Sequence, residues 1–352
     1  MISRRHHRTA LVAVFVLAMA LGVVVATLGV PQRIAATATS AAGTGETGEV
    51  EALRAERDQL VARLEADDAF AARIGPRVLD GALTGVPVTV VSIGADEADT
   101  RAIAELITVA GGTVAGDVVL TPAVTDPARA DQLRDLSARL LPAGAQLPAS
   151  SDAGALAGGL LGSALLAPGA DPGQAGAVVA GLAAGGFAEE PAGTADSTAA
   201  EAPVGTGTGQ PGTAAESPDG SAPGSPGGAP GAGELAVVVT GGALPGVDAG
   251  DAAATAAALA AELDLRGGGA VLVGRDGSAT PQGAVGAARA NPGSLSTVDD
   301  VGTGAGRIAT VLALAERAAG DTGQYGSGEG ASGPVPGPRE GAVPESANGS
   351  VG

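Results

Sequence analysis

Residues 86–120 read VPVTVVSIGADEADTRAIAELITVAGGTVAGDVVL, and this stretch decides the fold. Its first eight residues are apolar and β-branched, which predicts a buried strand. The next part places Ile103 and Ile107 on one face of a helix, and two glycines end that helix. The last part, at 113–121, predicts a second strand. A strand, a helix and a strand in this order are typical of a parallel sheet covered by helices, so we expect an α/β fold.

The same alternation continues toward the C-terminus. Further strands are predicted at ELAVVVTGG (234–242), AVLVG (270–274) and SLSTV (294–298), the last as a short edge strand. Helices are predicted between and after these strands. They are a helix from Asp126 to about Leu141, one or two helices within 142–187, a helix from about Asp251 to the glycines at 267–269, a short helix at 283–293 and a last helix ending at Gly320.

Two segments have a composition that does not support folding. Residues 188–233 contain no arginine, no aromatic residue and few aliphatic side chains larger than alanine. Such a segment cannot bury enough apolar surface to offset the entropy lost on ordering it. We therefore expect a disordered insert at 188–233 within one α/β domain spanning 75–326. A disordered tail is expected at 327–352, which is again rich in Gly, Pro, Ser and Glu.

The N-terminus has the pattern of a membrane anchor. Residues 1–8 contain three arginines, and an uncharged run of apolar residues follows at 9–31. About 20 apolar residues are needed for a helix to cross the hydrocarbon core, so 9–31 predicts a transmembrane helix. The alternative is a cleaved signal peptide, for which ATA at 36–38 is an acceptable cleavage site. The basic start places residues 1–8 in the cytoplasm and the bulk of the chain outside the cytoplasmic membrane.

A short coiled-coil stalk is predicted at 49–74. Its apolar residues fall on alternating spacings of three and four, but two charged residues interrupt the seam. The seam predicts either a homodimer or a solvated helix that pairs with nothing. It comprises Val50, Leu53, Arg57, Leu60, Leu64, Asp67, Ala71 and Ile74.

The composition excludes several functions. The formal net charge is −19, whereas a nucleic-acid-binding protein needs a basic surface. The chain has no cysteine, so it has no disulfide and no thiolate nucleophile. Its two histidines, His6 and His7, precede the predicted membrane helix and are not available to a serine triad in the folded domain. We expect neither a catalytic site nor a cofactor site.

Glycines 302, 304 and 306 precede the last helix and raise the possibility of a phosphate-binding loop. The dinucleotide fingerprint fails because Arg307 stands where its third glycine is needed, and a P-loop needs a lysine that this chain lacks. The start of the helix could still hold an anion beside Arg307. We predict instead a capped helix start, with a spacing of glycines that arose by chance.

Carboxylates are the remaining candidates for chemistry. Asp299 with Asp300, and the acidic residues at 96–99, lie just after predicted strands, where α/β proteins often have their sites. Helix capping is the more ordinary explanation. Beyond residue 31 the chain has no Cys, His or Met, so it offers Cu(I) no soft ligand, and no spaced calcium loop is present.

The order of these features resembles the actinobacterial MctB family, named for mycobacterial copper transport protein B. The most specific part is STVDD, AGRIATVLALAE and GQYG, between Ser296 and Gly326. Asp299, Arg307 and Tyr325 match the family pattern there. Asp300 stands where the family usually has Asn, and Gln324 stands where it usually has His. This departure at Gln324 removes an imidazole that the family could have offered to a metal.

The resemblance implies a role in copper homeostasis or efflux at the cell envelope, and family members are also associated with cell separation. We therefore expect a non-enzymatic, membrane-anchored protein that acts through envelope or membrane proteins as partners. The alternatives are a scaffold or regulator of cell separation and wall remodelling and, more distantly, an enzyme that uses carboxylates.

Overall fold

The computed structural model describes residues 45–190, 234–291 and 293–337. The predicted cytoplasmic start and transmembrane helix lie outside these residues, as do most of the predicted insert and the end of the predicted tail. Within the described ranges, every helix is either too short or too polar to cross a membrane.

The described chain contributes to two compact units, residues 1–65 and 66–352. Helix α3 (Gly45–Leu79) begins in the first unit and ends in the second. It covers the predicted stalk, but it continues five residues beyond Ile74 and includes Pro76. The apolar seam residues of the first unit are exposed by 42% to 59%; they are Val50, Leu53, Leu60 and Leu64. Pairing with a second copy stays a prediction.

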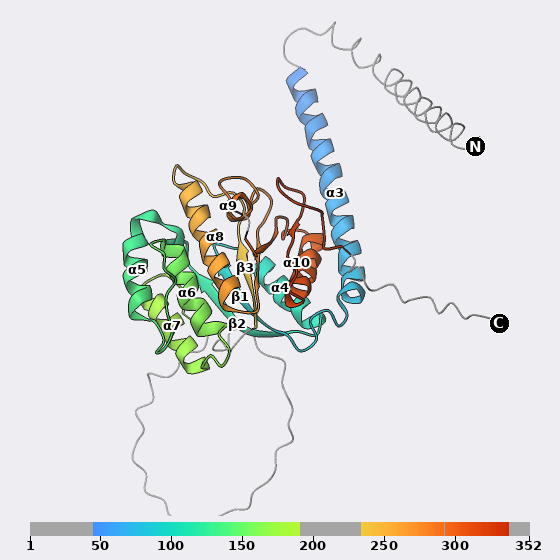
Figure 1. Cartoon of the computed structure of the whole chain (residues 1–352). Helices are drawn as coiled ribbons and strands as arrows, with labels where there is room; N and C mark the ends of the chain where they lie inside the picture. Colours follow the sequence, from blue (N-terminus) through green and yellow to red (C-terminus); the bar gives the residue numbers. More distant parts are fainter. Residues whose placement is uncertain (1–44, 191–233, 292, 338–352) are drawn as a thin grey trace, which may run out of the picture. The chain divides into compact units, whose positions relative to one another are not determined.

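The second unit contains a six-stranded sheet with helices on both faces (Figure 1). The strands lie in the order β2-β1-β3-β4-β5-β6, and all five neighbouring pairs are parallel, which confirms the predicted sheet. In chain order the elements are β1 (Pro87–Ile93), α4 (Glu97–Val109), β2 (Thr113–Leu120), the 3-10 turns η1 (Pro122–Thr125) and η2 (Pro127–Arg129), α5 (Ala130–Arg139), α6 (Ala153–Leu165), α7 (Pro172–Ala184), β3 (Leu235–Thr240), α8 (Ala249–Arg266), β4 (Ala270–Val273), α9 (Ala284–Ala290), β5 (Ser296–Val298), α10 (Gly304–Ala318) and β6 (Gln324–Tyr325).

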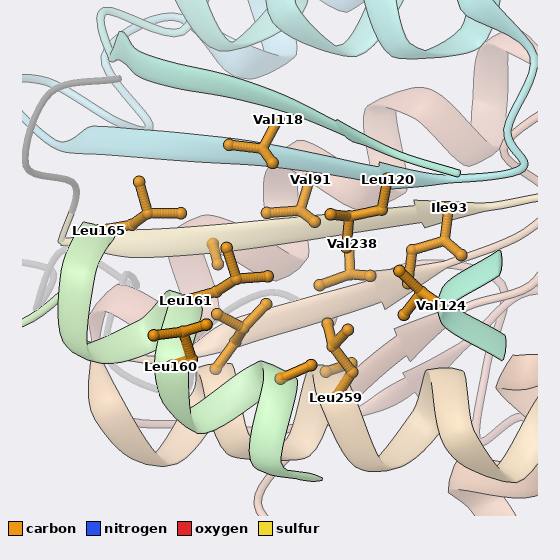
Figure 2. Close-up of a cluster of buried hydrophobic side chains, with 14 of the residues drawn as sticks. Val91, Ile93, Val118, Leu120, Val124, Leu160, Leu161, Leu165, Val238 and Leu259 are labelled. Atoms are coloured by element: carbon orange, nitrogen blue, oxygen red, sulfur yellow. The ribbon is translucent and has the colours of Figure 1, made fainter. Parts of the chain in front are cut away.

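Each face of the sheet has its own apolar core. On one face the strands pack against α5 to α9, and Figure 2 shows Val91 and Val238 of the sheet directed toward Leu161 and Leu259. On the other face, alternate strand residues such as Val90 pack with α4, α10 and the end of α3. The central strand β3 is buried along its whole length because both of its faces are covered, which explains its continuous apolar sequence.

The small residues of 142–187 permit a close helix pair. Two helices form there, and α6 packs on α8 with its glycines at the contact. A Cβ at Gly162 would lie 2.6 Å from the Cβ of Arg266, so any larger residue would push the helices apart. These glycines have a low helix propensity, and the tight packing against α8 compensates for it.

Three predicted boundaries need correction. SLSTV is not an edge strand, because β6 pairs with β5 and forms the edge. The predicted insert begins too early, since Ala188 is buried and bridges β2, and the amide of Glu189 donates to the carbonyl of Val119 at 2.8 Å. The tail is not free from residue 327, because the Ser332 amide donates to the Gln324 carbonyl at 2.7 Å. All three depend on long-range backbone pairing that composition does not reveal.

Candidate functional site

The carboxyl edge of the sheet is where a doubly wound fold usually binds its ligand. The crevice forms where consecutive strands leave in opposite directions, and here that point lies between β1 and β3. The loops after these strands begin at Gly94 and Gly241. A Cβ at Gly241 would lie 3.1 Å from the carbonyl oxygen of Gly94, and one at Gly242 would lie 2.6 Å from that of Asp276. The backbones of these loops therefore approach each other closely at this point.

A cluster of charged side chains closes this edge further. Asp99, in the first turn of α4, has a side chain that is 1% exposed, and it accepts from Arg307 of α10 at 3.0 Å and from Arg275 of the loop after β4. Arg275 also pairs with Asp96 at 3.0 Å, and Asp96 caps α4 by accepting from the amide of Ala98. The cluster thus joins α4, the loop after β4 and α10, which are far apart in sequence. It uses Asp96 and Asp99, two of the acidic residues that were candidates for acid–base chemistry.

Arg307 is partly buried, and its guanidinium bonds to groups of the protein itself. Its guanidinium donates to the carbonyls of Val301 and Gly302, each at 3.0 Å, as well as to Asp99. The sequence suggested that the first turn of α10 could hold an anion. The chain itself supplies that anion, because the Asp68 carboxylate of α3 accepts from the Gly304 amide at 2.7 Å. The Arg307 side chain is directed to these internal acceptors and does not form a phosphate site with the helix start.

Two of the three glycines around the start of α10, both of them within its first turn, have structural roles. A Cβ at Gly304 would lie 2.8 Å from the Cβ of Ala71 in α3, and a Cβ at Gly306 would clash with the backbone of Asp300. Thr303 caps the helix by accepting from the Gly306 amide at 3.0 Å. The prediction of a capped helix start is confirmed, but the view that the glycine spacing arose by chance is wrong for Gly304 and Gly306, since close backbone approach requires both.

Asp299 lies in a buried ion pair with Arg289 of α9. Their side chains are 3% and 5% exposed, and Oδ2 of Asp299 is 2.7 Å from Nη1 of Arg289. Asp299 also accepts from the amides of Ser327 and Gly328, while Arg289 donates to the carbonyl of Tyr325 at 2.7 Å. The pair therefore fastens the chain that follows β6. Its carboxylate has the surroundings of a structural anchor and not those of an exposed catalytic base.

Gln324, which departs from the family motif, and Tyr325, which matches it, also bond to groups within the protein. The Gln324 amide donates to the Leu295 carbonyl and its oxygen accepts from Thr297, so both ends of the amide are bonded to the β5 region. Tyr325 is 6% exposed, and its hydroxyl donates to Glu316 of α10. Burial, reinforced by this hydrogen bond, raises the pKa of the Tyr325 phenol above its ordinary value. The tyrosine packs the last helix against the sheet.

Asp300 is the least satisfied carboxyl at this edge. Its Oδ1 is buried and has no hydrogen-bond partner. Burial, with a smaller contribution from the charge of Asp299, raises the pKa of Asp300 above its ordinary 3.8. The folded protein thus holds this proton more tightly than the unfolded chain, so stability falls as the pH rises from about 3.8 through the raised pKa.

Asp300→Asn is therefore expected to stabilise the protein at pH 7, because asparagine does not ionise and so avoids the cost of burying a charged carboxylate. The gain is expected to be at most about 1 kcal/mol, since solvent screens a half-buried carboxyl. Urea unfolding at pH 7 and at pH 3 checks this: the gain should disappear at the lower pH, where Asp300 is protonated in both states. An equal gain at both pH values would show that ionisation is not its cause.

One open cavity was not expected from the sequence. It has a volume of about 390 Å³ and lies where η1, α5, α6 and α8 meet. Asp126, Asp152 and Asp251 line it together with Arg134. Asp126 and Asp152 cap η2 and α6, and no group of three or more acidic or histidine side chains within the described ranges is arranged to hold a metal ion. The cavity lining is polar, and its carboxylates mainly serve as helix caps.

Comparison with known proteins identifies relatives along most of the chain. The family described as "Copper transport outer membrane protein, MctB" matches residues 1–222 and 225–336. Proteins named copper transporter MctB from Mycobacterium tuberculosis and Mycobacterium bovis are each 35% identical to this chain over 348 residues, which cover 94% of this chain and 98% of theirs. The protein of the same name from Mycobacterium leprae is 32% identical over 268 residues, with 72% and 74% covered.

Proposed function

Because this chain belongs to the MctB family, we propose that it serves copper homeostasis or efflux at the cell envelope through protein partners. In this proposal the N-terminal helix at 9–31 anchors the protein in the cytoplasmic membrane and the α/β domain lies outside the cytoplasm. The relatives are named as transporters and not as enzymes, and the internal ion pairs of Asp99 and Asp299 give no support to the alternative of a carboxylate enzyme.

The proposal that partners take part rests on the copper ligands that this chain can offer. Cu(I) selects thiolate and thioether ligands, and imidazole suits Cu(II). The chain has no cysteine, and its only histidines and methionines, at positions 1, 6, 7 and 19, lie at or before the predicted membrane helix. Gln324, where the family usually has histidine, is consumed by hydrogen bonds within the β5–β6 region. Partners must therefore supply the soft ligands and the path for copper.

A soluble fragment covering 45–352 is expected not to bind Cu(I) tightly. Competition with a chromophoric Cu(I) chelator measures this, and the variant Gln324→His tests whether the imidazole of the family restores any binding. One added imidazole is expected to increase affinity only weakly, because Cu(I) binding needs several soft ligands. Submicromolar affinity of the unaltered fragment would contradict the proposal that partners supply the ligands.

The exposed apolar seam of α3 supports a role in protein contacts. Leu53, Leu60 and Leu64 are each more than half exposed, although such side chains are usually covered. A homodimer through this stalk is part of the proposal, and so is contact with envelope proteins. The same surface would suit the second candidate function, a scaffold or regulator of cell separation.

Pull-down of the full-length protein from membranes, with phenotypes of a deletion strain, distinguishes the two functions. Copper accumulation in the deletion strain with normal division would support the copper function. Chained cells with normal copper content, together with recovery of division or wall-hydrolase proteins, would favour the scaffold. A pull-down from the strain lacking the gene serves as the control for non-specific capture.

A further inference from the structure

The last turns of α3 are attached to the α/β domain in an uneven way. We call residues 68–79 the α3 arm. Its first residue, Asp68, and its last residue, Leu79, both contact the domain, and they lie about 16 Å apart at the rise of an α-helix. The contact at Leu79 is apolar and buried, whereas the contact at Asp68 is polar and exposed. Small side chains make the contacts between these two ends.

The attachment at Leu79 has the character of a hinge. Leu79 is fully buried, and so is Leu83 just beyond the helix end. Between and after them, Gly81 and Gly85 have φ angles of 72° and 74°, a region that favours glycine. The helix therefore ends in a tight glycine turn that is anchored at both sides by buried leucines.

The attachment at Asp68 is polar and exposed to solvent. Its Oδ1 accepts from the Gly304 amide at 2.7 Å. Gly304 is the first residue of α10, so its amide has no acceptor within its own helix, and a carboxylate at that end is also stabilised by the helix dipole. Asp68 itself lies on the surface, where water can replace it.

Little apolar surface holds the arm between these two points. Ala71 and Gly75 face Gly304 and the side chain of Ile308, and both are among the smallest residues available. Of the large apolar side chains before Leu79, Phe70 is 63% exposed, Val78 is 49% exposed and Ile74 is only partly buried. Pro76 also lies within this part of the helix, where it removes one backbone hydrogen bond.

We propose that the α3 arm is a detachable latch, hinged at Leu79 and held closed by Asp68 on the first amide of α10. Opening exposes the start of α10, one turn before the Arg307 that binds Asp99 at the carboxyl edge. The arm thus has a closed and an open position, and the change between them affects the start of α10 beside the charged cluster of Asp99, Arg275 and Arg307. This inference holds whichever of the two functions above is correct, because it depends only on contacts within residues 66–352.

Hydrogen exchange of the full-length protein in nanodiscs, measured by mass spectrometry, tests the latch. Asp68→Ala is compared with the unaltered protein and with Glu65→Ala, which removes a nearby exposed carboxylate that lies outside the seam and has no described contact with α10. In Asp68→Ala we expect the Gly304 amide to lose its protection and residues 66–78 to exchange about tenfold faster, the effect of losing one hydrogen bond to a charged group. Exchange in β1 and β3 should stay unchanged, and Glu65→Ala should resemble the unaltered protein.

Gly304→Ala provides a second route to the open state, because its methyl group would collide with Ala71 while Asp68 remains. It should increase exchange in residues 66–78 in the same way. Two results would overturn the proposal. One is unchanged exchange of residues 66–78 in both variants, since the arm would then be held by other contacts. The other is an equal rise in β1 and β3, since the arm would then unfold only with the whole domain.

Discussion

Arg289→Met is expected to lower the free energy of unfolding by about 3–5 kcal/mol, the usual cost of removing one partner of a buried ion pair. The change leaves the Asp299 carboxylate buried without its counter-charge, and it also removes the donors to Thr297 and to the carbonyls of Tyr325 and Glu329. Urea unfolding of the 45–352 fragment measures the loss. Limited proteolysis should show earlier cleavage after Tyr325, because the chain there loses its anchor.

Arg101→Met is the matched control for this prediction. Arg101 pairs with Glu97 on the surface of α4, and both side chains are more than half exposed. Such pairs contribute roughly 0.5 kcal/mol or less, so this variant should unfold almost as the unaltered protein does. A loss below about 1 kcal/mol in Arg289→Met would mean that water reaches Asp299 and that the pair is not buried in solution.

Asp264→Ala is expected to have the second largest effect, about 3–4 kcal/mol, for the same physical reason at the opposite edge of the sheet. The Asp264 side chain is 1% exposed, and it accepts from the Ala270 amide at 2.7 Å, from Arg317 at 2.9 Å and from Ser294. Removing this carboxylate leaves the Arg317 guanidinium and the Ala270 amide without their acceptor. The carboxylate joins the end of α8, the start of β4 and the last turn of α10, so these three elements should loosen at once.

Asp264→Asn separates the two parts of this effect. Asparagine keeps one oxygen that can accept from the Ala270 amide but has no charge for Arg317, so its loss should be smaller than that of Asp264→Ala. Glu262→Ala is the control, because its contact with Arg266 is 3.8 Å long on partly exposed side chains. If asparagine and alanine were equally harmful, the charge pair with Arg317 would account for the whole effect and the amide contact for none.

The strands that could be predicted are those with an intrinsic apolar pattern. VPVTVVSI and ELAVVVTGG became β1 and β3, since strands buried on both faces must be apolar throughout. The two-residue β6 could not be predicted, because Gln324 and Tyr325 pair with β5 only once α10 has returned the chain to the sheet. The order along the tail from residue 327 was missed for the same reason, as it depends on Asp299 and Arg289.

The roles of the candidate site residues were predicted less well than the fold. Asp299, Arg307, Gln324 and Tyr325 could be selected by their positions in a family motif, but the sequence does not show which groups they donate to or accept from. The role of Arg307 depends on its hydrogen bond to Asp99, which is 208 residues away and cannot be inferred from the sequence. Asp68 gave no signal at all, since the seam pattern selected its neighbour Asp67 instead.

The sequence by itself determined the α/β class, the parallel strands with a continuous apolar pattern and the lack of soft metal ligands beyond residue 31, because these depend on residue type and spacing alone. Only the tertiary structure decided that Arg307 holds Asp99, that Asp68 caps α10 and that Gly304 and Gly306 are needed for close approach. Each of these facts concerns groups from distant parts of the chain. A charged or small residue has no fixed role until folding determines which group it meets and how far water is excluded.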